Sequence, residues 1–213
     1  MTKQSFLDKL AELRAAHCED MPTPEMAVLT RATATLRRSG ILQDCLQTGE
    51  TAPDFTFIDA DNEHQRLYGL LKTGPVVLNF FRGLWCMYCK TELEAYTLIR
   101  DEMQAMGCHY LAISPQKTTN EDVADEHYQV LYDRNSLIAS RFKITYSLGM
   151  DEIKLFRSWG LKLDEVNQSE DWSLPIPATY IIARDRTVAY QFSDVDFRSR
   201  CCPDALVAEL QLL

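Results

Sequence analysis

Hydrophobic residues recur at helical spacing near the start of the chain. In residues 4–17 they are Phe6, Leu7, Leu10 and Leu13, and in residues 24–39 they are Met26, Leu29 and Leu36. Intervals of three and four place such residues on one face of an α-helix. Thr23 followed by Pro24 fits an N-cap and a first helical position, and Gly40 fits a helix stop. We therefore expect a helical N-terminal extension over residues 1–48.

After this extension the hydrophobic pattern changes to strands alternating with helices. The stretch "APDFTFID" alternates like a strand, and "PVVLNFF" is a continuous apolar run, typical of a parallel strand that is buried on both faces. A helical pattern over residues 93–106 ends at Gly107, and "HYLAISP" follows as the next strand. This order predicts a βαβ unit.

The rest of the chain continues the α/β pattern. We expect a helix over 120–128, a short strand over 129–133 and a helix over 135–142. "ATYIIA" and "TVAYQF" flank a charged connection, as in an antiparallel hairpin, and "PDALVAELQLL" is typical of a closing helix. Residues 151–172 are less regular, and their spacing fits an inserted helix with Ile153, Phe156 and Trp159 on one face. The chain is thus predicted to have one α/β domain over residues 49–213.

Composition and charge restrict the class of protein. The 213 residues are 46% hydrophobic, which is enough for one sizeable core. A formal net charge of −9 opposes binding to a phosphate backbone, so no nucleic-acid partner is expected. No apolar stretch is long enough to cross a bilayer, and the charged start lacks the apolar region of a signal peptide. We expect a cytoplasmic protein without a membrane partner. The seven irregularly spaced cysteines are unlike a secreted disulfide framework.

The stretch "RGLWCMYCKTELEAY" holds the strongest chemical signal. Its pattern places Cys86 in the turn after the apolar strand and Cys89 in the first turn of the next helix. Backbone N–H groups at a helix N-terminus stabilise a thiolate, which is the reactive form of cysteine. A C-x-x-C pair at such a junction therefore indicates redox chemistry. Two alternatives are a pair of buried structural cysteines and a zinc site. The only other close pair, Cys201 and Cys202, lacks the usual zinc spacing.

Three stretches resemble the AhpC/TSA peroxiredoxin-like family, in particular its branch with a thioredoxin-style C-x-x-C. They are residues 52–96, "AISPQ", and "IPATYIIARDRTVAYQF". The resemblance covers residues 49–213 and implies a thioredoxin-like fold, with a central mixed sheet flanked by helices. It further implies an antioxidant enzyme without a bound cofactor. Such an enzyme reduces hydroperoxides or disulfides and is restored by an external dithiol reductant such as a thioredoxin, a glutaredoxin or glutathione.

The family patterns assign the two cysteines different roles. In the thioredoxin pattern "WCMYCK" makes Cys86 the nucleophile and Cys89 the resolving thiol. Trp85 then belongs to the docking surface, and Pro177 is a cis-proline beside the disulfide.

In the peroxiredoxin pattern P-x-x-x-T-x-x-C-x-x-E, Cys89 instead takes the place of the peroxidatic cysteine. The positions of the family's Pro, its Thr and its activating Arg then hold Arg82, Cys86 and Pro177. In the family, the Thr hydroxyl and the activating Arg polarise the O–O bond of the peroxide. Their replacement by Cys86 and Pro177 should therefore weaken fast peroxide reduction. A C-x-x-C dithiol suits thiol–disulfide exchange.

Neither pattern fits the turn and the strand completely. The strand has Asn79 and Phe80 where thioredoxins bury an acid, so the sequence does not reveal a base. Arg82 offers partial electrostatic compensation in one interpretation and is a solvated surface charge in the other.

These observations predict a thiol oxidoreductase with a reversible Cys86–Cys89 disulfide, in which Cys86 attacks disulfides and Cys89 resolves. The residues assigned to substrate binding are Trp85, Pro177 and Arg82. The alternative from another class is a redox-sensing binding protein without turnover, which signals through the N-terminal helices. The sequence leaves open the substrate, the reductant and the oligomeric state, for which a homodimer is one candidate. It also leaves open whether Cys201 and Cys202 are an idle surface pair or include an activated N-cap thiol.

Overall fold

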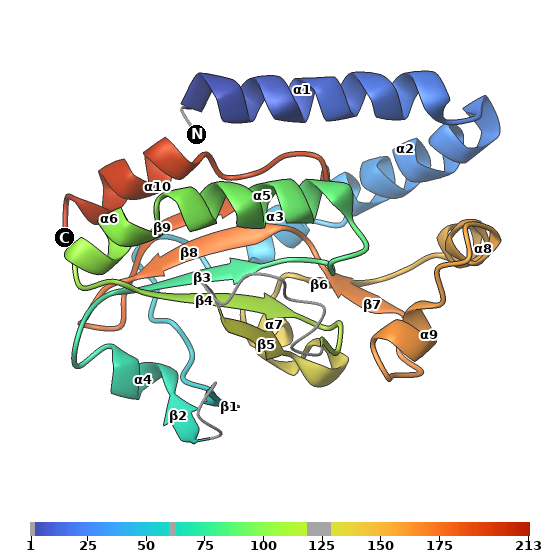
Figure 1. The fold of residues 1–213 in the computed structure, drawn as a ribbon. Helices are drawn as coiled ribbons and strands as arrows, with labels where there is room; N and C mark the ends of the chain where they lie inside the picture. The colour runs from blue at the N-terminus through green and yellow to red at the C-terminus, as the bar shows by residue number, and fades with distance from the viewer. Residues whose placement is uncertain (1–2, 60–62, 119–128) are drawn as a thin grey trace.

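The computed structural model describes residues 3–59, 63–118 and 129–213, and its centre is a five-stranded mixed sheet (Figure 1). The strand order is β5-β4-β3-β8-β9. The bounds are β3 Val76–Phe80, β4 His109–Ser114, β5 Gln129–Tyr132, β8 Ala178–Ile182 and β9 Val188–Ser193. Strands β3, β4 and β5 are parallel, whereas β8 runs antiparallel to both β3 and β9. The mixed sheet implied by the family resemblance is confirmed.

The central strand β3 is buried on both faces, as its continuous apolar run predicts. Alternate side chains enter different cores: Val76, Leu78 and Phe80 on one face, and Val77 and Phe81 on the other. This follows from the period of two along a strand. Asn79 shares the face of Val77, and its Nδ2 donates a hydrogen bond to Oγ1 of Thr179 over 3.1 Å. A polar group is therefore buried next to the helix that follows β3.

Helices cover both faces of the sheet (Figure 1). One face carries α5 Met87–Leu98, α6 Arg100–Ala105 and α10 Pro203–Leu210. The opposite face carries α3 Ile41–Asp44, the hairpin of β1 Thr56–Ile58 and β2 His64–Arg66, α4 Leu67–Leu70, η1 Arg134–Ser136 and α7 Leu137–Arg141. The predicted three-layer arrangement is confirmed.

The N-terminal helices pack onto this domain beside α5. Helix α1 Lys3–Asp20 lies across the outer side of α5 (Figure 1). Its Phe6 and Leu10 are buried in the same cluster as Leu93 of α5. The hydroxyl of Tyr88 on α5 also donates to the carbonyl of Leu13 over 3.3 Å. Helix α1 therefore adds a layer above α5, the helix that contains Cys89.

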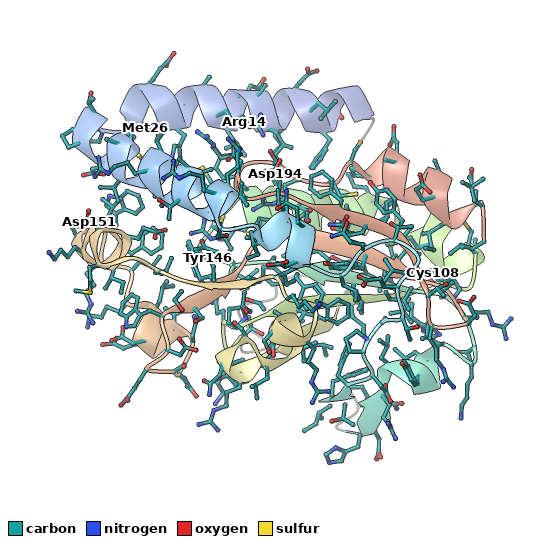
Figure 2. All side chains as sticks on the ribbon, turned by 180° about the vertical axis from the view of Figure 1, so that it is seen from behind. Arg14, Met26, Cys108, Tyr146, Asp151 and Asp194 are labelled. Carbon is teal, nitrogen blue, oxygen red and sulfur yellow. The ribbon has the colours of Figure 1, made fainter. Side chains whose placement is uncertain are left out.

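The second N-terminal helix extends this layer toward the other end of the molecule. Helix α2 Thr23–Arg38 packs against α8 Met150–Ser158. In the view from behind, the labels of Met26 on α2 and Asp151 on α8 lie at the same side (Figure 2). The boundary between residues 48 and 49 stays a prediction.

Several local expectations differ from the structure. Pro22 is the N-cap of α2, so Thr23 is already helical and the expected N-cap was wrong by one residue. The helix expected to run unbroken to residue 106 is interrupted at Ile99, which has φ −100° and ψ 6°. The strand expected over 52–59 is reduced to β1. The helix expected over 120–128 lies outside the described residues.

Residues 151–172, expected to be less regular, and the short segments on either side of them contain more structure than the pattern indicated. The inserted helix is confirmed as α8, but the sequence missed β6 Thr145–Ser147, α9 Leu163–Val166 and β7 Ser173–Pro175. Elements of three or four residues are too short to show a period. In the ranges that the structure describes, no helix combines the length and the hydropathy needed to span a membrane.

Candidate active site

The two cysteines lie at the junction of β3 and α5, as predicted. Cys86 is the N-cap of α5, and Cys89 is in the first turn of that helix. The backbone N–H of Cys86 donates to the carbonyl of Gly83 over 3.2 Å. Gly83 has φ +152°, and a Cβ there would lie 2.2 Å from Nε1 of Trp85. The turn that presents the pair therefore requires a glycine.

The two thiols differ in their access to the surface. Cys86 is 6% exposed and lines a cavity of 470 Å³, whereas Cys89 is 0% exposed and does not line it. Both are free thiols in this structure. A molecule in the cavity thus meets Cys86 first.

The site separates the pKa values of the two thiols. A hydrogen bond from the Cys89 thiol, helped by the charges of Arg82 and Arg200, lowers the pKa of Cys86 to about 5 against the opposing effect of burial. Burial, followed by the same hydrogen bond, raises the pKa of Cys89 well above its ordinary value. The proton therefore stays on Cys89, and the negative charge is placed on Cys86.

Arg200 is one of the residues of the site that sequence reasoning missed. It lies in the loop between β9 and α10, and its Nη2 is 3.3 Å from Sγ of Cys89 and 4.0 Å from Sγ of Cys86. Its Nη1 also donates to the carbonyl of Phe197. The guanidinium is buried and forms an ion pair with Glu92, with 3.1 Å between Nε and Oε2. This contact supplies an arginine from a part of the chain in which neither family pattern places one.

Glu92 supplies the buried acid that β3 lacks. It lies one turn beyond Cys89 on α5 and occupies the Glu position of the peroxiredoxin pattern, a signal that could have identified it. Burial raises the pKa of Glu92 to about 7, although the charge of Arg200 and hydrogen bonds from Asn79 and from the backbone of Cys201 oppose the rise. A carboxylate with this pKa exchanges protons near neutral pH.

The cavity beside Cys86 is lined mainly by apolar and aromatic side chains. The aromatic ones are Trp85, Tyr88, Phe156, Trp159 and Phe197. The N-terminal helices and the connection between them add His17, Met21 and Leu29. The structure thus places Trp85 in the same cavity wall as Cys86, and it brings the N-terminal helices to the same site.

Arg82 is buried at this cavity. It is 4% exposed, so the interpretation as a solvated surface charge was wrong. Its guanidinium carbon lies 4.9 Å from the ring centre of Trp85 and 4.8 Å from that of Phe197. Arg82 therefore stacks on aromatic rings that line the cavity.

The expected cis bond before Pro177 is also wrong. Every peptide bond among the described residues is trans. Pro177 is buried in the extended link between β7 and β8, where the N–H of Ile176 donates to the carbonyl of Ile144 over 2.8 Å. A residue before proline favours this extended conformation, and trans is the preferred isomer. A role of Pro177 in substrate binding stays a prediction.

Cys201 and Cys202 do not form a surface pair. Cys201 is buried, and burial raises its pKa to about 12 despite hydrogen bonds from Tyr96 and Tyr190. Cys202 is the N-cap residue of α10 and packs partly buried against the cluster that contains Cys86 and Cys89. The expectation of an idle surface pair was wrong for Cys201.

A thioredoxin-like sheet with paired thiols at the β3–α5 junction defines a thiol oxidoreductase. The family model described as AhpC/TSA family matches residues 48–191. The chain belongs to the AhpC/TSA family. It is a peroxiredoxin-like, thiol-based antioxidant enzyme.

Comparison with solved structures gives the same fold. The peroxidoxin BcpB from Mycobacterium tuberculosis has a TM-score of 0.58 at 22% identity, with coverage of 79% of this chain and 98% of that one. The 2-Cys peroxiredoxin of Plasmodium vivax has a TM-score of 0.55 at 16% identity, with coverage of 77% and 80%. Peroxiredoxin Q of Xanthomonas campestris has a TM-score of 0.57 at 14% identity, with coverage of 79% and 98%. A sequence search of curated proteins gives no match.

Proposed function

We propose that the enzyme reduces hydroperoxides or disulfides through a dithiol–disulfide cycle of Cys86 and Cys89, with Cys86 as the attacking thiolate. The observation that carries this proposal is the position of Cys86 in the cavity wall, with the protonated Cys89 directly behind it. A thiol with a pKa of about 5 is a thiolate at neutral pH. The reactive form is therefore present where a substrate arrives.

With a hydroperoxide, the Cys86 thiolate attacks the distal oxygen and the O–O bond breaks. The products are a sulfenic acid on Cys86 and an alkoxide, which takes a proton and leaves as an alcohol. Cys89 then attacks the Cys86 sulfur, the S–S bond forms, and the departing hydroxide leaves as water with the Cys89 proton. When the substrate is hydrogen peroxide, the leaving group is hydroxide, which leaves as water in place of the alcohol.

With a disulfide, the Cys86 thiolate forms a mixed disulfide and releases one thiol. Cys89 must then lose its proton before it can displace the second thiol. Glu92 accepts this proton near neutral pH, while Arg200, 3.3 Å from Sγ of Cys89, stabilises the forming thiolate. In this proposal Arg200 is a positioning residue for both sulfurs.

An external dithiol closes the cycle. A thioredoxin-like protein, a glutaredoxin or two molecules of glutathione would reduce the Cys86–Cys89 disulfide, and a reducing compartment such as the cytoplasm supplies all three. No bound cofactor takes part, and each electron pair passes through sulfur.

For hydroperoxides, one observation favours a second assignment, in which Cys89 is the attacking thiolate. Arg200 lies closer to Cys89 than to Cys86, as expected if Cys89 carried the peroxidatic thiolate. The complete burial of Cys89 opposes this assignment, since peroxide must reach the attacking sulfur. Comparison of the two single Cys variants, given in the Discussion, distinguishes the two.

Stopped-flow oxidation tests the function itself. The reduced protein is mixed in parallel with hydrogen peroxide, with cumene hydroperoxide and with a small disulfide, and then with dithiothreitol as reductant. An enzyme consumes many equivalents of at least one oxidant per protein. Oxidation of one equivalent followed by no turnover would instead identify the redox sensor.

A further inference from the structure

We propose that the cavity beside Cys86 selects substrates that combine an aromatic or flat apolar body with an anionic group, and that Arg82 binds the anion. The cavity beside Cys86 is the one of 470 Å³ described above. This inference rests on the proposed role of Cys86 and adds the class of substrate.

Arg82 is a buried cation that forms no ion pair with a carboxylate among the described residues. Its guanidinium lies against the rings of Trp85, Phe156 and Phe197, with 4.9, 5.7 and 4.8 Å between the guanidinium carbon and the ring centres. Its Nε is buried and has no hydrogen-bond partner within the part of the chain that the structure describes. Stacking satisfies the faces of a guanidinium, while its N–H groups point along the plane and need acceptors.

The negative groups that the structure describes near Arg82 do not supply acceptors for its N–H groups. Glu152 lines a small adjoining cavity of 20 Å³ together with Arg82 and Tyr146. Its Oε2 accepts a hydrogen bond from the backbone N–H of Gly149 over 2.9 Å. Among the described residues no carboxylate lies within ion-pair distance of Arg82. The Cys86 thiolate is the other nearby negative group, and it loses its charge when it reacts.

The remaining wall of the cavity indicates the body of the ligand. Its lining residues include aromatic side chains from the cysteine turn, α8 and the loop after β9, and none of the described side chains that line it is an aspartate or a glutamate. A volume of 470 Å³ lies within the range that holds small organic ligands, roughly 300–1,000 Å³. Hydrogen peroxide needs no such wall, whereas an aromatic body gains from stacking on it.

Arg82 and Cys86 line the same cavity from the two ends of one turn, since Arg82 follows the end of β3 and Cys86 begins α5. An anionic group bound by Arg82 therefore lies near the bond that Cys86 attacks. The geometry favours aryl or short-chain hydroperoxides and disulfides that carry a carboxylate close to the reacting bond. A charge-assisted hydrogen bond in a desolvated site supplies the selectivity.

Binding of unreactive probes tests the anion site without any turnover. The probes are 3-phenylpropionate and 3-phenylpropanamide, titrated into the reduced full-length protein with tryptophan fluorescence as the signal, because Trp85 and Trp159 line the cavity. We expect the carboxylate to bind at least about tenfold more tightly than the amide. In Arg82→Met this ratio should fall to within about twofold, and Arg82→Lys should keep part of it.

A matched control distinguishes the effect of removing Arg82 from the effect of removing any positive charge. Arg157 also stacks on a tryptophan, with 4.8 Å from its guanidinium carbon to the ring centre of Trp172, but it lies outside the cavity. Arg157→Met should keep the wild-type ratio. If Arg82→Met does not fold, as judged by circular dichroism, Arg82→Gln gives the same comparison.

Reactive probes connect the anion site to the chemistry. Reduced protein should react faster with 5,5′-dithiobis(2-nitrobenzoate), corrected for intrinsic reactivity with free cysteine, than with the neutral 4,4′-dithiodipyridine, and Arg82→Met should remove this preference. Equal affinity of the carboxylate and amide probes in the wild type, or an unchanged ratio in Arg82→Met, overturns the inference while turnover still supports the proposed function. Selective carboxylate binding without turnover of any oxidant would overturn the proposed function and leave the anion site in place.

Discussion

Arg200 lies 3.3 Å from the sulfur of Cys89, although 111 residues separate them in the sequence. Through the same guanidinium it approaches Cys86 and pairs with the buried carboxylate of Glu92. The two thiols, the arginine and the carboxylate form one buried cluster. A residue that is distant in the sequence therefore contributes to the charge on both sulfurs.

Single cysteine variants should reveal which sulfur attacks. With a small disulfide, Cys89→Ser should form a stable mixed adduct on Cys86, because no second thiol can release it, and Cys86→Ser should form almost none. Mass mapping after non-reducing digestion measures both. Cys108→Ser is the control, since Cys108 is a partly buried free cysteine outside the site. Rapid sulfenic acid formation in Cys86→Ser but not in Cys89→Ser would reverse the assignment.

The reactivity of Cys86 should follow its lowered pKa. The rate of alkylation by iodoacetamide should rise as the pH rises through about 5 and level off above it, because the thiolate is the reacting form. Cys89→Ala removes the hydrogen bond that lowers this pKa most, so its midpoint should shift upward. Mass spectrometry of quenched samples gives the rates. A wild-type midpoint close to the ordinary value of 9.0 would contradict the charge distribution described for the site.

Replacement of Arg200 should affect both stability and reactivity. Arg200→Met leaves Glu92 buried without its partner, and breaking a buried pair costs about 3–5 kcal/mol of unfolding free energy. The midpoint of Cys86 alkylation should also rise, which a purely structural role would not cause. Arg198→Met is the neighbouring control, because Arg198 pairs with Asp196 over 2.8 Å. An unchanged alkylation midpoint in folded Arg200→Met would remove Arg200 from the site.

Glu92 should make the folded protein less stable as the pH rises. Its pKa is about 7 in the folded state and 4.5 ordinarily, so the folded state binds the proton more tightly. The resulting stabilisation is complete below about 4.5 and is lost as the pH rises through about 7. Urea unfolding of the reduced protein at a series of pH values should show this loss, and Glu92→Gln should flatten it. An equally steep dependence in Glu92→Gln would assign it to other groups.

The cysteine turn should not tolerate a side chain at Gly83. A Cβ would meet Nε1 of Trp85 at 2.2 Å and Oε1 of Gln116 at 2.8 Å, at a φ of +152°. Gly83→Ala should therefore lower the free energy of unfolding by roughly 1–3 kcal/mol and slow alkylation of Cys86. Gly69→Ala is the control, because nothing lies within 4 Å of its Cβ position. Equal stability of the two variants would show that the turn adapts.

The features that could be predicted from the sequence are those that a short, local pattern of residues specifies. The continuous apolar run of β3 and the cysteine spacing located the β3–α5 junction, because burial on both faces and a helix start each have a local signature. The positions of Phe6 and Leu10 predicted a helix, but nothing in their spacing indicated that it would cover α5. Arg200 was missed for the same reason, since its partners are set by the tertiary fold.

The charges around the sulfurs also affect the reduction potential of the proposed Cys86–Cys89 couple. In the reduced state the negative charge on Cys86 lies near the guanidinium groups of Arg82 and Arg200. When the proposed Cys86–Cys89 disulfide forms, this charge disappears, and the buried cations Arg82 and Arg200 lose a negative neighbour. Electrostatics therefore favours the dithiol, and a couple whose reduced form is stabilised has a less negative reduction potential. In the proposed Cys86–Cys89 cycle we therefore expect the oxidised enzyme to accept electrons readily, so that even a weakly reducing thiol pool restores it.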